Sequence, residues 1–274
     1  MSTSVEAPNR FGKVSELRIA TEFRDGKTIM AERFFTAPFK IMLPLYEWKF
    51  EGTEVMQMLQ LMASPGIMAG DTQKFSFDIR EGSVCEYCTQ AYEKVHKMNG
   101  GVGHRTVDIN VEKNSFFYFH PKPIIPFKDS AVQNDINITL EDDTSKFIYE
   151  EILCCGRVAF GESFDYRFFN NSVNVFKGGK LIFRDNVQFR PDEFDMTGEG
   201  MYEGYTHLAN QIFFNVPRSD EWVAEVLDIL KKEPEMDGGI TRLATGDVVV
   251  RFFGMSGDPM EKMLARIQKL KDEF

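Results

Sequence analysis

The sequence predicts a mainly β protein whose strands are stacked in layers or wound into a β-helix-like coil, with a smaller α-helical part near the C-terminus. Three observations lead to this prediction. Alternating apolar and polar stretches recur along the chain, and each is followed by a tight polar turn. Clear helical periodicity begins only after residue 218. Phenylalanine is abundant, with 26 residues, which fits a thick aromatic core between stacked layers.

Length, charge and hydropathy exclude several function classes. With 274 residues we expect a single domain over 1–274, with a stacked β-strand body at 10–195 and a C-terminal α/β part at 196–274 packed on it. The net charge of −10 argues against nucleic-acid binding, which needs a concentrated basic face. A polar N-terminus and the lack of an apolar run of about 20 residues predict no membrane span and a cytoplasmic location.

The first predicted elements are a hairpin and a buried strand. Residues 17–23 alternate in polarity, Asp25-Gly26 provides a turn, and residues 28–35 return, which is a hairpin pattern. The longest charge-free run, residues 55–70, is interrupted by Pro65 and several polar residues. We therefore expect a buried strand followed by a turn there.

Four strand–turn–strand units follow. Their turn residues are Gly82, Asn114, Asp143 and Gly178, so the steps between them are 32, 29 and 35 residues. The first strands are at 75–79, 107–111, 136–140 and 173–175, and the return strands at 84–87, 116–119, 147–149 and 181–183. A step of about 30 residues favours strand pairs stacked in layers or wound in a coil. An ordinary β-sandwich with irregularly spaced hairpins explains the pattern equally well.

Helices are predicted late in the chain. Ser219 can cap a helix that runs through Lys232, with Asp220 and Glu221 at the positive end of its dipole. The apolar face of this helix is then Val223, Val226, Leu227 and Leu230. The apolar residues 248–253 predict a buried strand after it.

A second helix is predicted from Asp258 onward. Asp258 is expected to be the N-cap, with Pro259 at the first helical position and Glu261 completing a capping-box-like pattern. The helix carries an apolar stripe that we expect to pack on the protein's own sheet: Met260, Met263, Leu264, Ile267 and Leu270.

Cysteine and histidine are too scarce for a metal scaffold, with four residues of each. Cys85 and Cys88 fall in a predicted strand, where residues i and i+3 face opposite sides, so they cannot share a metal or a disulfide. The adjacent Cys154 and Cys155 have the same constraint, and we interpret all four as buried, small apolar residues. No phosphate-binding loop, nucleophile elbow or zinc-protease motif is present.

Three carboxylates stand out because their surroundings are apolar or rich in turns. They are Asp71, Glu151 and Asp185. Simple structural roles are also possible for each of them: an Asx turn for Asp71, an exposed or Arg-paired position for Glu151, and a local pair with Arg184 for Asp185.

Five ordered segments of the chain form a recognisable pattern. They are residues 31–40 (AERFFTAPFK), 64–71 (SPGIMAGD), 89–95 (TQAYEKV), 151–157 (EILCCGR) and 161–164 (GESF). In this order and spacing the sequence resembles the urease accessory protein family UreD, called UreH in some lineages. The resemblance runs from about Leu17 to the region of His207.

The resemblance implies a non-enzymatic maturation factor with a mostly β fold. Such a protein acts with UreF and, through UreF, with the GTPase UreG on apo-urease, and helps to deliver nickel. The resemblance also places Asp71, Glu151 and Asp185 along an internal channel for transient Ni²⁺, with no cofactor bound permanently. Carboxylates are weaker nickel ligands than Cys or His, so they could pass the ion on.

Two other functions remain open from the sequence. A β-coil hydrolase acting on sugars would need a carboxylate pair, such as Glu150/Glu151 or Asp142/Asp143. A purely structural clamp would reshape urease without touching nickel. Glu93 and Lys94, which are adjacent in the sequence, are interpreted as an ion pair on the protein surface.

Overall fold

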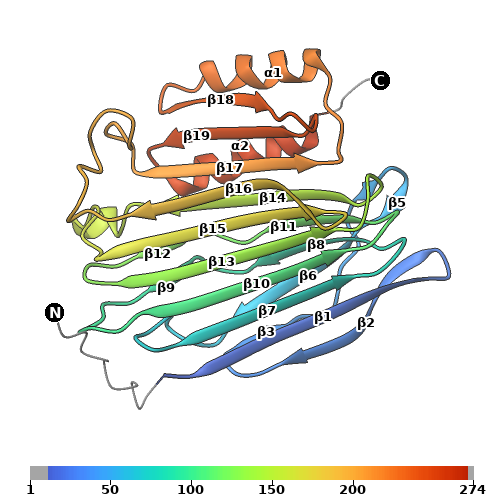
Figure 1. Ribbon diagram of the computed structural model, residues 1–274, viewed down its shortest axis with the longest axis horizontal. Coiled ribbons are helices and arrows are strands. Elements are labelled where there is room, and N and C mark those ends of the chain that lie inside the picture. The colour runs from blue at the N-terminus through green and yellow to red at the C-terminus, as the bar shows by residue number, and fades with distance from the viewer. Residues whose placement is uncertain (1–11, 271–274) are drawn as a thin grey trace.

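The computed structural model describes residues 12–270, which form two large mixed β-sheets and two short helices (Figure 1). Sheet A has seven strands in the spatial order β16-β15-β13-β10-β7-β1-β2. Its strands are β1 (Val14–Arg24), β2 (Lys27–Phe35), β7 (Thr72–Ile79), β10 (Gly103–Val111), β13 (Ala131–Leu140), β15 (Phe168–Lys177) and β16 (Lys180–Phe189). The prediction of a mainly β protein with a smaller, late helical part is confirmed.

Sheet B has ten strands, eight of which lie in the order β18-β19-β17-β14-β11-β8-β6-β3, with β12 beside β14 and β9 beside β12. They are β3 (Phe39–Ile41), β6 (Met56–Met62), β8 (Val84–Thr89), β9 (Glu93–Val95), β11 (Phe116–His120), β12 (Ile124–Pro126), β14 (Lys146–Cys154), β17 (His207–Phe214), β18 (Met236–Arg242) and β19 (Val248–Gly254). A small hairpin, β4 (Lys49–Phe50) and β5 (Thr53–Glu54), and a 3-10 turn, Val158–Phe160, complete the strands and turns.

The predicted hairpin and buried strand are both present. Strands β1 and β2 pair antiparallel, and the turn residues Asp25 and Gly26 both have positive φ, at 53° and 79°. Two consecutive left-handed residues match the right-handed twist of the strands on either side. Strand β6 lies in the charge-free run and alternates between buried and half-buried residues.

The first three strand–turn–strand units stack as layers. In each unit the first strand lies in sheet A and the return strand in sheet B: β7 to β8, β10 to β11 and β13 to β14. Neighbouring units pair parallel and in register, so that Phe75, Val107, Ile136 and Val173 form one row. The step of about 30 residues in the sequence therefore brings each unit beside the previous one.

The fourth unit does not follow this pattern. Strand β16 does not cross to sheet B but pairs antiparallel with β15 in sheet A. Gly178 and Gly179 both have positive φ, at 54° and 76°, so the chain reverses in a two-residue hairpin turn. The spacing of turn residues along the sequence does not distinguish a hairpin within one sheet from a connection that crosses between the two sheets.

The C-terminal elements extend and cover sheet B. Helix α1 (Asp220–Lys231) begins where predicted, and the Ser219 side chain accepts a hydrogen bond from the Trp222 backbone N–H. Its buried face is Trp222, Val226, Ile229 and Leu230, slightly rotated from the predicted one. Strand β19 matches the predicted buried strand, whereas β18 was missed because Gly238-Gly239 interrupts its pattern.

Helix α2 (Gly257–Lys269) begins two residues earlier than predicted. Its N-cap position is Ser256, whose side chain makes no capping bond, and Asp258 lies in the first turn, 2.6 Å from Lys262 Nζ. The prediction of Asp258 as the N-cap is therefore wrong. The apolar stripe packs on the outer face of sheet B, against residues such as Val250 and Phe252.

An aromatic core fills the space between the sheets. Phe77 of sheet A contacts Tyr87, Phe117 and Phe119 of sheet B, with ring centroids 4.7, 5.6 and 5.8 Å apart. All four cysteines are free, and only Cys88 is not fully buried. Within residues 12–270, no helix has the length and apolar character needed to cross a membrane.

Candidate functional site

A row of buried polar side chains runs across the inner face of sheet A. Each member lies two positions before an apolar residue that faces the core, and each is in register with the next on the neighbouring strand. None is more than 5% exposed. The row consists of Ser15, Gln73, Arg105, Asn134 and Asn171. Polar groups in this position need partners from the opposite sheet or from water.

Sheet B supplies such partners across the core. Arg105 Nη1 lies 2.6 Å from Glu93 Oε2, and Asn171 Nδ2 lies 2.9 Å from Glu151 Oε2. A third contact is the ion pair between Asp185 of β16 and Arg251 of β19. We call this set the polar seam: the five residues of the row with Glu93, Glu151, Asn210, Arg251 and Asp185.

Glu151 lies in the middle of the seam and is 6% exposed. Its carboxylate accepts hydrogen bonds from Tyr149 Oη at 2.8 Å, Asn171 Nδ2 at 2.9 Å and Asn210 Nδ2 at 2.8 Å. Burial raises the pKa of this carboxyl, and the hydrogen bonds from Tyr149 and Asn210 oppose that rise. Within residues 12–270 no ion pair reaches it, so the exposed or Arg-paired interpretation of Glu151 is wrong.

Asp185 lies at the far end of the seam. Its partner Arg251 donates through Nε to Asn210 Oδ1 at 2.6 Å, and Asn210 in turn donates to Glu151. The Asp185 side chain is 17% exposed and that of Arg251 is 42% exposed, so the seam reaches the surface here. Arg184 faces the other way and bonds Asn174, which makes the local pairing with Asp185 wrong.

Asp71 lies at the opposite end, in the loop before β7. Its carboxylate accepts hydrogen bonds from the backbone N–H of Met68 at 2.9 Å and of Lys13 at 3.1 Å, so it does stabilise a local turn. Asp71 also lines a cavity of about 1100 Å³ together with Ser15 and Gln73, the first two residues of the seam. We call this cavity the mouth cavity.

The structure therefore connects Glu151 and Asp185 through Arg251 and Asn210, whereas Asp71 is connected to the seam only through the mouth cavity. A second cavity, of about 20 Å³, lies at Arg105, Asn134, Tyr149 and Glu151. Four buried seam atoms have no hydrogen-bond partner within residues 12–270: Gln73 Oε1, Glu93 Oε1, Arg105 Nε and Asn134 Oδ1. Buried polar atoms of this kind commonly bind ordered water.

Comparisons with known proteins decide the family. The sequence model described as "UreD urease accessory protein" matches residues 13–274. This chain belongs to the UreD family. It is 34% identical over 262 residues to urease accessory protein UreD of Acetivibrio thermocellus, covering 96% of this chain and 98% of that protein. It is 30% identical over 261 residues to UreH of Helicobacter acinonychis, covering 95% and 96%.

Membership of the UreD family settles the broad activity. UreD-family proteins are non-enzymatic chaperones of urease maturation, as the resemblance predicted. Their association with nickel delivery concerns a cargo and not a resident cofactor. Within residues 12–270 of this UreD-family chain, no group of three or more His, Cys, Asp or Glu side chains is arranged to hold a metal ion.

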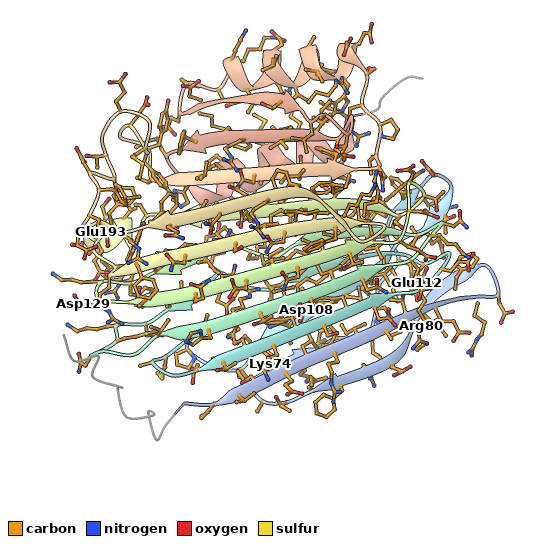
Figure 2. The ribbon with its side chains drawn as sticks, in the orientation of Figure 1. Lys74, Arg80, Asp108, Glu112, Asp129 and Glu193 are labelled. Carbon is orange, nitrogen blue, oxygen red and sulfur yellow. The ribbon has the colours of Figure 1, made fainter. Side chains whose placement is uncertain are left out.

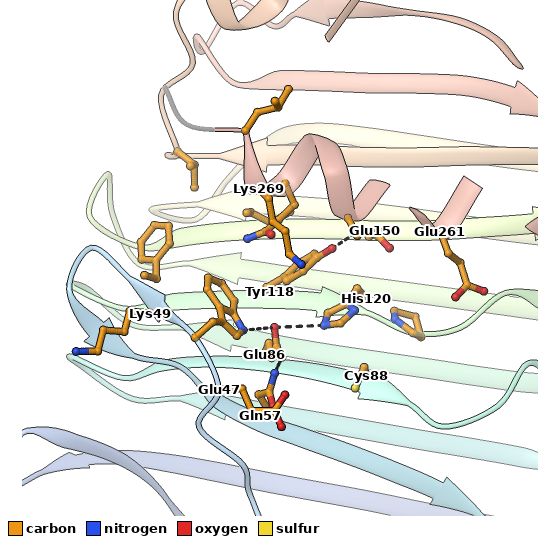
Figure 3. Close-up of a pocket in the computed structure, with 18 of the residues that line it drawn as sticks. Glu47, Lys49, Gln57, Glu86, Cys88, Tyr118, His120, Glu150, Glu261 and Lys269 are labelled. Atoms are coloured by element: carbon orange, nitrogen blue, oxygen red, sulfur yellow. Dashed lines mark hydrogen bonds and ion pairs between the residues drawn. The ribbon is translucent and has the colours of Figure 1, made fainter. Parts of the chain in front are cut away.

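The carboxylate pairs considered for a hydrolase are not pairs in this UreD-family chain. Glu150 faces away from Glu151, toward a cavity of about 1090 Å³ on the outer face of sheet B, which we call the outer cavity (Figure 3). Asp142 caps its own turn by accepting from Thr144, and Asp143 lies 2.6 Å from Lys177 Nζ. Neither pair can act as an acid and a nucleophile on one bond.

The outer cavity holds its own buried acids. Glu86 accepts hydrogen bonds from Trp48 Nε1 at 3.0 Å and Gln57 Nε2 at 2.6 Å, with His120 Nε2 3.5 Å away (Figure 3). Glu150 accepts from Tyr118 and, at 2.9 Å, from Gln211 Nε2. Burial raises the pKa of Glu150, as it does for Glu151.

Most of the seam was not foreseen from the sequence. Glu93 was interpreted as a surface partner of Lys94, but it is buried and pairs with Arg105, because neighbours in a strand face opposite ways. A usable signal was present in the repeat. On each of five strands, a polar residue occurs two positions before a core residue. These core residues are Leu17, Phe75, Val107, Ile136 and Val173, and the five polar residues form the row of the seam on sheet A.

Proposed function

We propose that this UreD-family chain helps to deliver nickel to the urease active site and that the polar seam is the route of the ion. Its partners in this proposal are UreF, UreG through UreF, and apo-urease. One observation carries the proposal. Polar groups continue from the mouth cavity at Asp71, past Glu151, to the partly exposed Asp185, through a core that is otherwise aromatic and aliphatic.

The chemistry of the seam suits an ion in transit. Apart from two guanidinium groups, the seam offers carboxylate, amide and hydroxyl groups, whose oxygens bind Ni²⁺ less tightly than thiolate or imidazole. An ion must be bound well enough to enter and weakly enough to leave. Glu151, whose pKa is raised by burial, gains its charge most easily when a cation is near.

A polar route through this core must also be hydrated. The four unpartnered atoms at Gln73, Glu93, Arg105 and Asn134 lie along the first half of the seam, where water can satisfy them. Waters held at these atoms would supply part of the ion's hydration shell during passage. These unpartnered atoms support the proposed route, because in a purely structural core we would expect buried polar atoms to have hydrogen-bond partners within the protein.

The test replaces the three carboxylates separately and together: Asp71→Ala, Glu151→Ala and Asp185→Ala. Each change should lower the nickel content and activity of co-expressed urease, by about tenfold or more for the triple variant, while the complex still co-purifies. Asp108→Ala is the matched control, because Asp108 lies on the outer face of sheet A (Figure 2). Full activity of the triple variant would overturn the proposed route and favour a structural clamp.

We further infer the architecture, the domain organisation and the cellular location of this chain. The alternation of three units between two sheets supports a coil of stacked strands, and the pairing of β17 with β14 supports a single domain over residues 1–274. A cytoplasmic location belongs to the same proposal. Limited proteolysis tests the single domain, because separate units would yield a stable fragment ending near residue 195.

A further inference from the structure

Arg105 and Glu93 form the most deeply buried ion pair of the seam. Their side chains are 5% and 9% exposed, and the Nη1–Oε2 distance is 2.6 Å. Arg105 comes from β10 of sheet A and Glu93 from β9 of sheet B, so the pair spans the core between the sheets. The guanidinium also lies over the Phe75 ring, 4.9 Å from its centroid.

The position of this pair divides the seam in two. Gln73, which lines the mouth cavity, is the in-register neighbour of Arg105 on one side. Asn134 is its neighbour on the other side, and Arg105 lines the small cavity together with Asn134 and Glu151. Along the row, Arg105 therefore stands between the mouth cavity and Glu151.

A guanidinium in this place opposes a cation on the way to Glu151. Arginine keeps its positive charge inside proteins, and repulsion between charges is strong where water is scarce. The carboxylate of Glu93 is meanwhile occupied by Arg105. At the far end the Asp185 carboxylate is likewise held by Arg251, which leaves Glu151 between two arginine–carboxylate pairs.

We propose that Arg105 and Glu93 are a gate in the nickel route. In the closed state the guanidinium holds the Glu93 carboxylate. In the open state the guanidinium moves away from Glu93, and the negative charge of the Glu93 carboxylate balances the positive charge of the passing ion. Glu93 Oε1 and Arg105 Nε have no partner within residues 12–270, so each group has a free position from which this exchange can begin. This proposal rests on the function proposed above.

The gate predicts opposite effects for its two halves. Arg105→Gln leaves a buried carboxylate without its cation, so the purified chain should bind one Ni²⁺ about 100-fold more tightly than wild type and release it slowly to urease. Glu93→Gln leaves a cation without its carboxylate, so Ni²⁺ binding should not rise and urease activation should fall. A merely structural ion pair would give neither variant added affinity for Ni²⁺.

The double variant Glu93→Gln/Arg105→Gln removes both charges and keeps a neutral hydrogen bond. It is expected to fold even where a single variant does not, and to mature urease better than Glu93→Gln, because no unpaired guanidinium blocks the seam, without binding extra Ni²⁺. The matched control is Arg157→Gln/Glu162→Gln, an arginine–glutamate pair outside the seam. Affinity is measured by titrating the purified chain with Ni²⁺ alone, and activation by co-expression with urease and its accessory proteins.

The outcomes separate the gate from the route. If the Asp71, Glu151 and Asp185 triple variant lowers nickel loading but the Arg105 and Glu93 variants match the control pair, the route stands and the gate is wrong. If the double variant is as defective as the triple variant, the gate is also wrong. If the triple variant loads urease fully, the proposed function fails and the gate fails with it.

Discussion

Glu150 and Glu151 are neighbours on β14, yet they belong to two different polar regions. Both are buried, both accept hydrogen bonds from a tyrosine and an amide, and burial raises the pKa of both. Glu150 faces the outer cavity beneath α2, whereas Glu151 faces the seam between the sheets. Burial and a raised pKa are therefore common to both regions, and what distinguishes the proposed route is its continuity with other polar groups.

The two regions also differ in their charge pairing. The two buried acids of the outer cavity, Glu86 and Glu150, bond mainly to neutral donors such as Trp48, Gln57 and Tyr118. Two of the three acids in the core of the seam are held by arginines. We expect that breaking a seam pair costs far more stability than removing a donor in the outer cavity.

The largest expected effect on stability is that of Arg105→Met. This change leaves Glu93 buried without a partner, which should lower the free energy of unfolding by about 3–5 kcal/mol. Urea denaturation measures the loss. The double variant Glu93→Gln/Arg105→Gln should recover most of it, and an equal loss in both variants would show that packing around Arg105, not its charge, matters.

The next effect separates the two neighbouring glutamates. Glu151→Gln should lower the nickel content of co-expressed urease about tenfold, because an amide cannot carry the charge that balances the ion. Glu150→Gln should leave nickel content unchanged, since its cavity lies outside the seam. Metal analysis of purified urease makes the comparison, and equal losses in the two variants would contradict the distinction between the regions.

A smaller effect concerns pH. A carboxyl whose folded pKa is raised binds more protons in the folded state, so the protein loses stability as pH rises above about 4.5 and through the folded pKa. Glu150→Gln and Glu151→Gln should each flatten this decline, because neither variant has the titrating carboxyl. Glu150→Gln can keep both hydrogen bonds to Oε2, whereas Glu151→Gln loses one, because Glu151 accepts on both oxygens. Urea midpoints measured between pH 4.5 and 7 test this. An unchanged slope would mean that these acids titrate normally.

The smallest effect is expected in the outer cavity. Trp48→Phe removes the indole N–H that donates to Glu86 at 3.0 Å and should cost about 1 kcal/mol. Nickel loading should not change. Thermal unfolding and metal analysis together check this. A clear drop in nickel content would extend the route to the outer cavity.

Local patterns were enough to predict much of the fold. The first hairpin, both helices and the stacked units follow from alternation, turn residues and capping signals that lie within a few residues of one another. The turn at Gly178-Gly179 was predicted, but not that β16 stays in sheet A, because strand pairing is not encoded in the turn residues alone. Helix α2 begins at Gly257, two residues before the predicted start, because short-range signals fix element boundaries only loosely.

The site was harder to predict than the fold. Glu151 and Asp185 were singled out mainly because they match positions in a family, whereas the residues alone favoured ordinary structural roles. The contacts of Glu151 with Asn171 and of Asp185 with Arg251 join residues 20 and 66 positions apart. Such contacts depend on the register between distant strands, which no single segment encodes.

The in-register stacking of the units has a consequence for the length of the seam. Neighbouring strands are about 4.8 Å apart, so the five strands from Ser15 to Asn171 span roughly 19 Å. Inserting or deleting one unit would change this length by one strand spacing and leave the local chemistry intact. The hairpin at Gly178-Gly179 ends the series and turns Asp185 back toward Arg251, so the number of repeats before it sets how far apart the two ends of the seam lie.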